Sequence, residues 1–265
     1  MYFRLIYKVL LVILLAAIIG GCTAFQRGTL TPIATITSTA VASSPKPTLP
    51  STDAPLLTPA SFLADYAFPE EIDATKHYLF YLHGKIIEDQ GIPAISPEFG
   101  EYEYRAILEK LSSYGFTVIS EPRPKDTVST AYAKKVAEQV RVLLDSGVPA
   151  SNITLVGASK GGGIAILASN LLENKELNFV MMAICEPATV DVLVKNGIFL
   201  FGNVLSIYES SDELAGSCQG YLSTSVGKGL SRYDEIILNT GLAHGFLFQP
   251  LEEWVEPAVK WAMQP

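Results

Sequence analysis

Residues 152–163, with the sequence NITLVGASKGGG, constrain the fold of this chain more than any other stretch. The apolar, β-branched run at 153–156 is typical of a buried strand. Residues 157–161 then fit the pattern G-x-S-x-G. Apolar residues follow at helical spacing, namely Ile164, Leu167 and Leu171. The sequence therefore predicts a strand, a tight turn and a helix, with Ser159 at the turn.

A serine in such a turn is a candidate nucleophile, because the turn pushes its hydroxyl out above the strand ends. Small residues two places before and after it, here Gly157 and Gly161, let the strand and the helix pass closely. The helix N-terminus leaves N–H groups beside the serine that can stabilise an oxyanion. Three successive glycines at 161–163 each cost about 1 kcal/mol relative to alanine, so packing or function should offset them. The alternative is an ordinary glycine-rich turn.

The N-terminal residues have the features of an export signal. Arg4 and Lys8 supply positive charge, and the apolar run at 10–19 is too short to favour a membrane span. Two glycines and Cys22 follow. This arrangement resembles a bacterial lipoprotein signal, which implies a signal peptide over residues 1–21 and lipidation of Cys22. The resemblance also implies an extracytoplasmic protein anchored to the bacterial cell membrane, with an uncleaved anchor helix as the alternative.

Residues 22–60 are rich in Thr, Ser, Pro and Ala and carry almost no charge. Such a segment cannot bury enough apolar surface to offset its ordering entropy, so we expect a disordered tether. Residues 61–265 are long enough for one domain with a sizeable core.

Strand-length apolar runs alternate with helical patterns through this domain. The expected strands are 78–82, 117–120, 153–156, 179–185, 204–208 and 235–239. The expected helices are 102–114, 130–146, the helix after Ser159, and 252–263. Alternating βαβ units predict an α/β fold, a doubly wound and mostly parallel sheet of about six strands with helices on both faces.

Charge and histidine placement exclude several classes of function. The net charge is -8 and the basic residues are scattered, so nucleic acid is not expected as a partner. The G-x-G arrangement after Ser159 has no acidic residue placed for a dinucleotide site. The three histidines are far apart and outside any metal-ligand pattern, so we expect neither a metal nor a cofactor.

Three cysteines are present, and lipidation of Cys22 would leave Cys185 and Cys218 as an even pair. In an oxidising compartment such a pair is a candidate disulfide. Two buried free thiols are the alternative.

With its strand, serine turn and helix inside alternating βαβ units, the chain resembles the α/β-hydrolase family over residues 76–263. The resemblance implies a triad in the chain order nucleophile, acid, base, each on a turn after a strand. His244, the one histidine after Ser159, follows the last expected strand and would be the base. Asp212, on the loop after the strand before it, would be the acid. Glu186 is the alternative acid, and Glu213 is a near neighbour that could substitute.

The same resemblance implies where an oxyanion would be held. His83 and Gly84 match the family's His-Gly turn, so the backbone N–H groups of Lys85 and Lys160 are the expected donors. We expect His83 itself to be a structural hydrogen-bonding residue of that loop. The short interval at 186–203 leaves no room for a large cap domain and predicts an open site. Apolar residues could form an acyl wall there, namely Ile92, Ile95, Phe99 and the segment 198–201, unless they pack into the core.

The expected function is therefore a serine hydrolase that cleaves small-molecule carboxylic esters through an acyl-serine intermediate. A thioesterase or a peptidase on the same fold is an alternative within this class. A non-catalytic surface-binding lipoprotein that has retained the fold is an alternative from another class. The membrane, through the lipid anchor, is the other expected partner, and the sequence leaves the oligomeric state open.

Overall fold

The computed structural model describes residues 59–264. The expected signal peptide, Cys22 and nearly all of the expected tether lie outside the described residues. The last two tether positions begin a short helix, α2 (Pro59–Ala64). Within residues 59–264 no helix is both long and apolar enough to cross a membrane.

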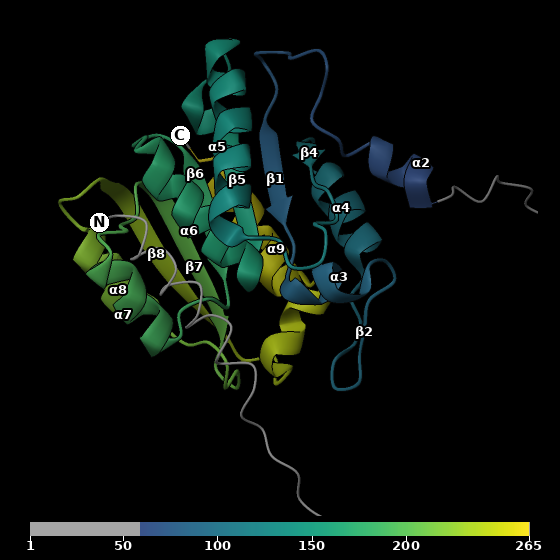
Figure 1. The fold of residues 1–265 in the computed structure, drawn as a ribbon, viewed down its shortest axis with the longest axis vertical. Helices are drawn as coiled ribbons and strands as arrows, with labels where there is room; N and C mark the ends of the chain where they lie inside the picture. The colour runs from purple at the N-terminus through teal and green to yellow at the C-terminus, as the bar shows by residue number, and fades with distance from the viewer. Residues whose placement is uncertain (1–58, 265) are drawn as a thin grey trace, which may run out of the picture. The chain divides into compact units, whose positions relative to one another are not determined.

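Six parallel strands form the central sheet, in the order β4-β1-β5-β6-β7-β8 (Figure 1). They are β1 (Tyr78–Leu82), β4 (Thr117–Ile119), β5 (Ile153–Ala158), β6 (Asn178–Met182), β7 (Gly202–Glu209) and β8 (Leu230–Leu238). A separate antiparallel pair joins β2 (Ile95–Ser96) to β3 (Gly100–Glu101). The predicted α/β class and the strand number are confirmed.

Helices cover both faces of the sheet, and each face has its own core. One core packs α4 (Tyr104–Ser112) and α9 (Glu252–Ala262) on the sheet, and the other packs α5 (Ser129–Asp145), α6 (Lys160–Leu172) and α8 (Gln219–Ser225). Figure 1 shows α5 and α6 in front of the sheet and α9 behind it. Alternate residues of β1 enter the two cores, since successive strand residues point to opposite faces. This explains why β1 is apolar at every position.

The remaining helices are short. They are α3 (Lys85–Gln90), α7 (Pro187–Lys195) and two 3-10 helices, η1 (Ala150–Asn152) and η2 (Ala243–Phe248). Between β6 and β7 the only described helix is α7, with 9 residues, so the expectation of no large cap domain is confirmed.

Two expected strands differ from the structure by three or more residues at one end. β6 ends at Met182 because Ala183 takes a φ of 49°, and its N–H donates to the carbonyl of Ile207 at 3.0 Å. β8 begins at Leu230, five residues before its expected start at 235. Its first half is polar and largely exposed at the edge of the sheet, so it has no apolar run that would predict a strand.

Parallel strands bring the residues that follow them to one edge of the sheet. Ser159 follows β5, Asp212 follows β7 and His244 follows β8, so all three lie at the carboxyl ends of the strands. Residues 198–201 precede β7, so they lie at the amino ends of the strands and away from Ser159. Leu200 is buried there in one of the two cores. Of the two alternatives for this segment, packing into the core is therefore the one that the structure supports.

Candidate active site

Ser159 occupies the turn between β5 and α6 with φ 51° and ψ -117°. Residues other than glycine rarely adopt such a backbone conformation. The N–H of Ser159 donates to the carbonyl of Met182 at 2.8 Å, which ties the turn to the end of β6. The serine is thus held at the sheet edge in a fixed and strained conformation.

The glycines around Ser159 are required by space. A Cβ added to Gly157 would lie 2.4 Å from the carbonyl oxygen of Gly161, and one added to Gly161 would lie 1.8 Å from that of Leu82. A Cβ on Gly163 would make only an ordinary contact, 3.5 Å from Ile184. The predicted close passage of strand and helix is confirmed at the positions two before and two after the serine.

Two backbone donors lie near this turn. Lys85 and Lys160 are the first residues of α3 and α6, so their N–H groups have no acceptor within their own helices. Gly84 brings the first of these loops to the serine, since a Cβ added there would lie 3.9 Å from Cβ of Ser159. The hydroxyl of Ser159 makes no hydrogen bond to another described residue.

Asp212 and His244 form a hydrogen-bonded pair, with Nδ1 of the imidazole 2.7 Å from Oδ2 of the carboxylate. The Asp212 side chain is 1% exposed and that of His244 is 13% exposed. Oδ1 of Asp212 accepts the N–H of Leu214 at 2.9 Å, which fixes the carboxylate. Because Nδ1 faces Asp212, Nε2 is the ring nitrogen left for proton transfer.

A second carboxylate joins the loops that carry this pair. Glu209, the last residue of β7, is 1% exposed and accepts hydrogen bonds from the hydroxyls of Ser210, Ser211 and Thr240. The hydroxyl of Ser211 in turn accepts the N–H of Ala243, next to His244, at 3.2 Å. Nothing in the sequence pattern indicated a role for Glu209.

The other acidic candidates are placed elsewhere. Glu186 caps α7, where its carboxylate accepts the N–H groups of Ala188 and Thr189 at 3.0 and 2.8 Å. The hydrogen bond from Ala188 and those from Thr189 lower its pKa, although burial opposes them. Among the described residues Glu186 makes no hydrogen bond to His244, and Glu213 is exposed.

His83 is fully buried and makes one hydrogen bond within its loop and one to the segment after β4. Its Nδ1 lies 2.8 Å from the carbonyl oxygen of Gly84, and its Nε2 accepts the N–H of Arg123 at 2.8 Å. Burial, together with the charge of Arg123, lowers the pKa of His83 to about 3. The ring is therefore neutral at physiological pH, and the expected structural role of His83 is confirmed.

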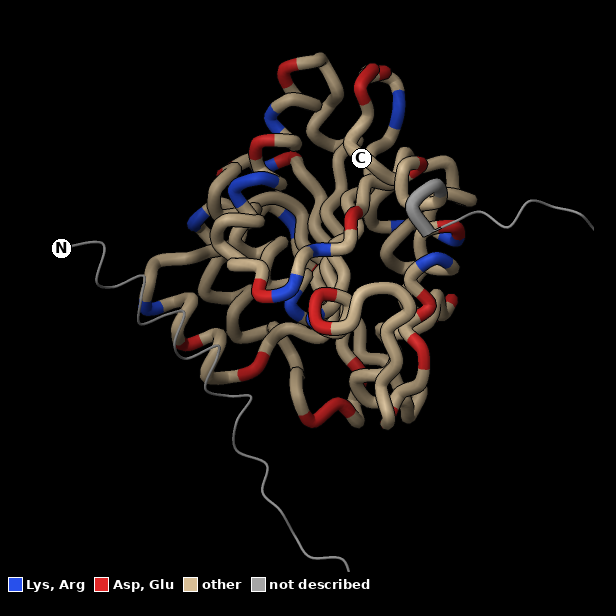
Figure 2. The backbone as a smooth tube through the Cα atoms, turned by 45° about the vertical axis from the view of Figure 1, so that its right-hand side comes forward, with Lys and Arg blue, Asp and Glu red and all other residues tan. Residues whose placement is uncertain are grey.

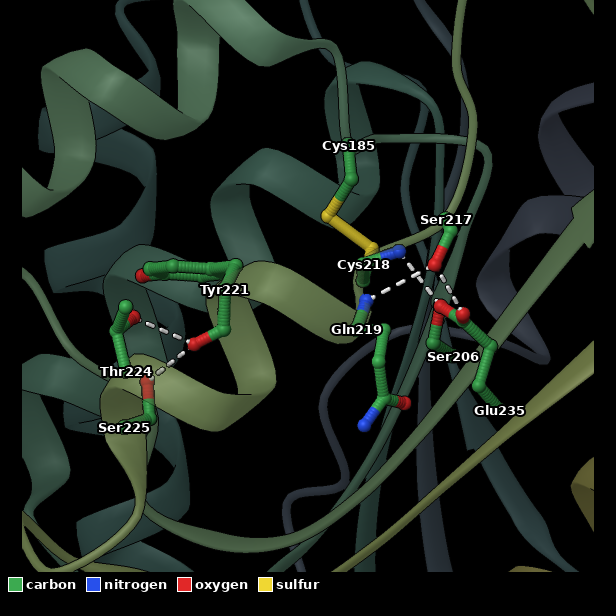
Figure 3. The surroundings of a disulfide bond; sticks show 9 residues. All are labelled: Cys185, Ser206, Ser217, Cys218, Gln219, Tyr221, Thr224, Ser225 and Glu235. Atoms are coloured by element: carbon green, nitrogen blue, oxygen red, sulfur yellow. Dashed lines mark hydrogen bonds between the residues drawn. A yellow bond between two sulfur atoms is a disulfide. The ribbon is translucent and has the colours of Figure 1, made fainter.

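A disulfide joins Cys185, after β6, to Cys218, before α8 (Figure 3). Their Cα atoms lie 5.1 Å apart, and the closed segment includes Asp212. Glu235 of β8 supports the bridge, since its carboxylate accepts the N–H of Cys218 at 2.6 Å and the hydroxyl of Ser206 at 2.8 Å. The loop with the candidate acid is thus attached to β6, β7 and β8.

A pocket of about 340 Å³ is lined in part by Ala243 and Gly245, the residues on either side of His244. Its lining is Glu98, Phe99, Gly241, Leu242, Ala243, Gly245 and Gln249. Phe99 therefore does reach the neighbourhood of the site, whereas Ile92 and Ile95 are 36% and 56% exposed. Figure 2 shows acidic and basic residues interspersed along the described backbone. No group of acidic, His or Cys side chains in residues 59–264 is arranged to hold a metal ion.

No protein-family model matches this sequence, and no curated protein sequence matches it either. Similar solved structures include a Pyrobaculum calidifontis esterase, with 17% identity, TM-score 0.48 and coverage of 73% of this chain and 76% of that one. Another belongs to the metagenome-derived lipolytic enzymes LipS and LipT, with 13% identity, TM-score 0.48 and coverage of 71% and 94%. A third is MGS-M1, an α/β hydrolase from a deep-sea metagenome, with 11% identity, TM-score 0.46 and coverage of 72% and 88%. At these values the function has to be inferred from the residues of this chain.

Proposed function

We propose that this protein is a serine hydrolase that cleaves carboxylic esters through an acyl-enzyme intermediate. The observation that carries the proposal is the hydrogen bond between His244 and the buried Asp212, at the sheet edge where Ser159 occupies its strained turn. Nucleophile, base and acid follow strands in that chain order, which is the order of a triad on such a sheet.

In the proposed acylation, Nε2 of His244 accepts the hydroxyl proton of Ser159 while Oγ bonds to the ester carbonyl carbon. Hydrogen bonds between such groups are often long without substrate and shorten when it binds. The N–H groups of Lys85 and Lys160 stabilise the oxyanion, and Asp212 stabilises the imidazolium. The carbon–oxygen bond to the alcohol then breaks, and the alcohol leaves with the proton from His244.

Deacylation repeats these steps with water. His244 takes a proton from the water as its oxygen attacks the acyl carbon, and the same two N–H groups stabilise the second oxyanion. The bond between the acyl carbon and Oγ breaks, Ser159 regains its proton from His244, and the carboxylic acid leaves.

Labelling with a fluorophosphonate tests the proposal, since the reagent reacts with an activated serine. We expect labelling of the wild-type protein and none of Ser159→Ala, whose melting temperature should stay nearly unchanged. A series of p-nitrophenyl esters of increasing acyl length, with thioesters and amides for comparison, would then identify the bond that is cleaved. An unlabelled, folded wild-type protein would instead favour the non-catalytic binding protein.

We also propose that Cys22 carries the lipid anchor. The support is the charged, apolar and Gly-Gly-Cys sequence before the expected tether. Cys22→Ser should prevent lipid attachment and release the domain from membranes, because each buried methylene contributes about 0.8 kcal/mol. A variant that stays uncleaved and membrane-bound would favour the anchor helix.

A further inference from the structure

Glu88, on α3, is a buried carboxylate that binds two cations from distant parts of the chain. Its Oε1 lies 2.6 Å from Nε of Arg123, and its Oε2 accepts a hydrogen bond from Nζ of Lys160. The side chains of Glu88 and Arg123 are 1% and 0% exposed, and that of Lys160 is 19% exposed. None of these side chains takes part in the proton transfers proposed above.

Lys160 and Arg123 each connect this cluster to a backbone segment that carries one of the expected oxyanion donors. Lys160 directly follows Ser159, and its Nζ also donates to the carbonyl of Thr127 at 2.8 Å. Arg123 donates a side-chain hydrogen bond to the carbonyl of His83, two residues before Lys85. Glu88 therefore connects the loop after β1 with the first residue of α6.

Such a cluster is poorly explained by stability alone. Removing charges from water is costly, and well-packed apolar side chains are often at least as stabilising as a buried ion pair. Moreover, one terminal nitrogen of Arg123, Nη1, is buried and has no hydrogen-bond partner among the described residues. What the cluster does provide is a rigid, directional connection between two loops.

We propose that Glu88 and Lys160 are positioning residues that fix the two oxyanion donors relative to each other and to Ser159. The inference rests on the proposed function and adds a side-chain role for Lys160. The bridge from Glu88 to Lys160 holds the start of α6 close enough to the loop after β1 for the N–H groups of Lys85 and Lys160 to reach the same oxygen atom. Misplacing either donor weakens binding of the oxyanion in the transition state and leaves binding of the neutral ester nearly unaffected.

A direct electrostatic effect is the competing explanation, because two cations and one anion leave one positive charge in the cluster. The two explanations predict opposite results for Glu88→Gln. That variant increases the positive charge near the oxyanion but breaks the bridge. Positioning therefore predicts a lower kcat, whereas a direct effect of charge predicts an unchanged or higher one.

The main experiment compares Lys160→Met with Lys160→Arg, since both leave the ion pair of Glu88 and Arg123 in place. We expect Lys160→Met to lower kcat roughly 10- to 100-fold, with KM within about twofold of the wild-type value. Lys160→Arg should keep most of the wild-type kcat. Inhibition by a trifluoromethyl ketone, which forms a tetrahedral oxyanion adduct with the serine, should weaken in parallel with kcat/KM. Lys135→Met is the control, because Lys135 forms only an exposed ion pair with Glu121. This variant should leave kcat and the affinity for the inhibitor unchanged.

The results separate the inference from the proposed function. A labelled wild-type protein whose Lys160→Met variant keeps full kcat and full inhibitor affinity would refute the positioning role alone. A folded Glu88→Gln variant with unchanged or raised kcat would do the same. If Glu88→Gln does not fold, Lys160→Gln decides the question, because its amide can still donate to Glu88 but carries no charge. Positioning then predicts a higher kcat than that of Lys160→Met, whereas a direct effect of charge predicts the same kcat for the two variants. Absence of labelling in the wild-type protein would refute the proposed function and this inference with it.

Discussion

The carboxylate of Glu209 accepts the N–H and the hydroxyl of Thr240 at 2.9 and 2.7 Å, so it joins the end of β7 to the loop after β8. Burial would raise the pKa of Glu209, but the hydrogen bonds from Thr240 and Ser211 outweigh it and lower that pKa. The group is therefore ionised at neutral pH, and its negative charge strengthens these hydrogen bonds. The geometry of Asp212 and His244 depends on this connection.

Glu209→Gln should destabilise the protein by about 2 to 4 kcal/mol, because an amide cannot accept all of the hydrogen bonds that the carboxylate accepts. Activity of the folded variant should fall by roughly tenfold, since a small displacement of the proposed base, His244, is costly. Urea unfolding and steady-state kinetics measure the two effects. Glu213→Gln, at an exposed carboxylate of the same loop, is the control and should change stability by less than about 0.5 kcal/mol.

Asp212→Asn and Glu186→Gln distinguish the two candidate acids. Asp212→Asn should lower kcat by roughly 10³- to 10⁴-fold without a large loss of stability, because the amide no longer holds the correct imidazole tautomer. Glu186→Gln should instead cost about 1 kcal/mol of stability, through the cap of α7, and leave kcat unchanged. The opposite pattern of kcat values would transfer the acid role to Glu186.

Alanine substitutions test the close approach at the serine turn. Gly161→Ala should abolish labelling or folding, because the added Cβ would lie 1.8 Å from the carbonyl oxygen of Leu82. Gly163→Ala, three residues into the same helix, adds the same methyl group at an ordinary contact distance. We expect that variant to be as stable as the wild-type protein or up to about 1 kcal/mol more stable. Equal behaviour of the two variants in thermal unfolding and labelling would contradict the assigned packing.

Replacing Cys185 and Cys218 by serine should cost about 2 to 4 kcal/mol, because the bond closes a segment with a sequence separation of 33. Since the segment carries Asp212, activity should also fall under conditions where the variant is still folded. The mass of a non-reduced tryptic digest of the protein checks the bond itself. Two separately alkylatable cysteine peptides would show that it does not form.

The buried His83 should make stability depend on pH. Its pKa is about 3 in the folded protein against 6.5 for an unperturbed histidine, so between these values the unfolded chain binds a proton that the folded protein does not. Stability therefore falls as the pH falls through this range, by up to about 1.4 kcal/mol per pH unit. His83→Gln should show a smaller slope in urea unfolding between pH 7 and pH 5. Equal slopes would mean that folding does not lower the pKa of His83.

Local patterns in the sequence predicted the sheet and the serine turn well. The apolar run of β1 and the glycines on both sides of Ser159 depend on burial and on close approach, and both leave a periodic or compositional signal. The polar first half of β8 and the short α3 leave no such signal. The sequence could not decide whether 198–201 walls the site or packs into the core, because apolar character indicates burial but not at which end of the strands a segment lies.

The supporting carboxylates could not be found in this way. Glu88 reaches Arg123 across 35 positions and Lys160 across 72, and Glu209 reaches Thr240 across 31. In the sequence each is one acidic residue among many. Only the fold reveals that these side chains are inside the protein and which donors surround them.

The attachment of the Asp212 loop to β6, β7 and β8 has a consequence for the timing of activity. No stretch of sequence shorter than the interval from Cys185 to His244 contains all of the contacts that hold the acid beside the base. A nascent or unfolded chain therefore lacks the assembled site, although every side chain of the proposed triad is present in it. For the proposed hydrolase, turnover can begin only after β8, the outermost strand, has joined the sheet. Turnover therefore indicates that folding is complete.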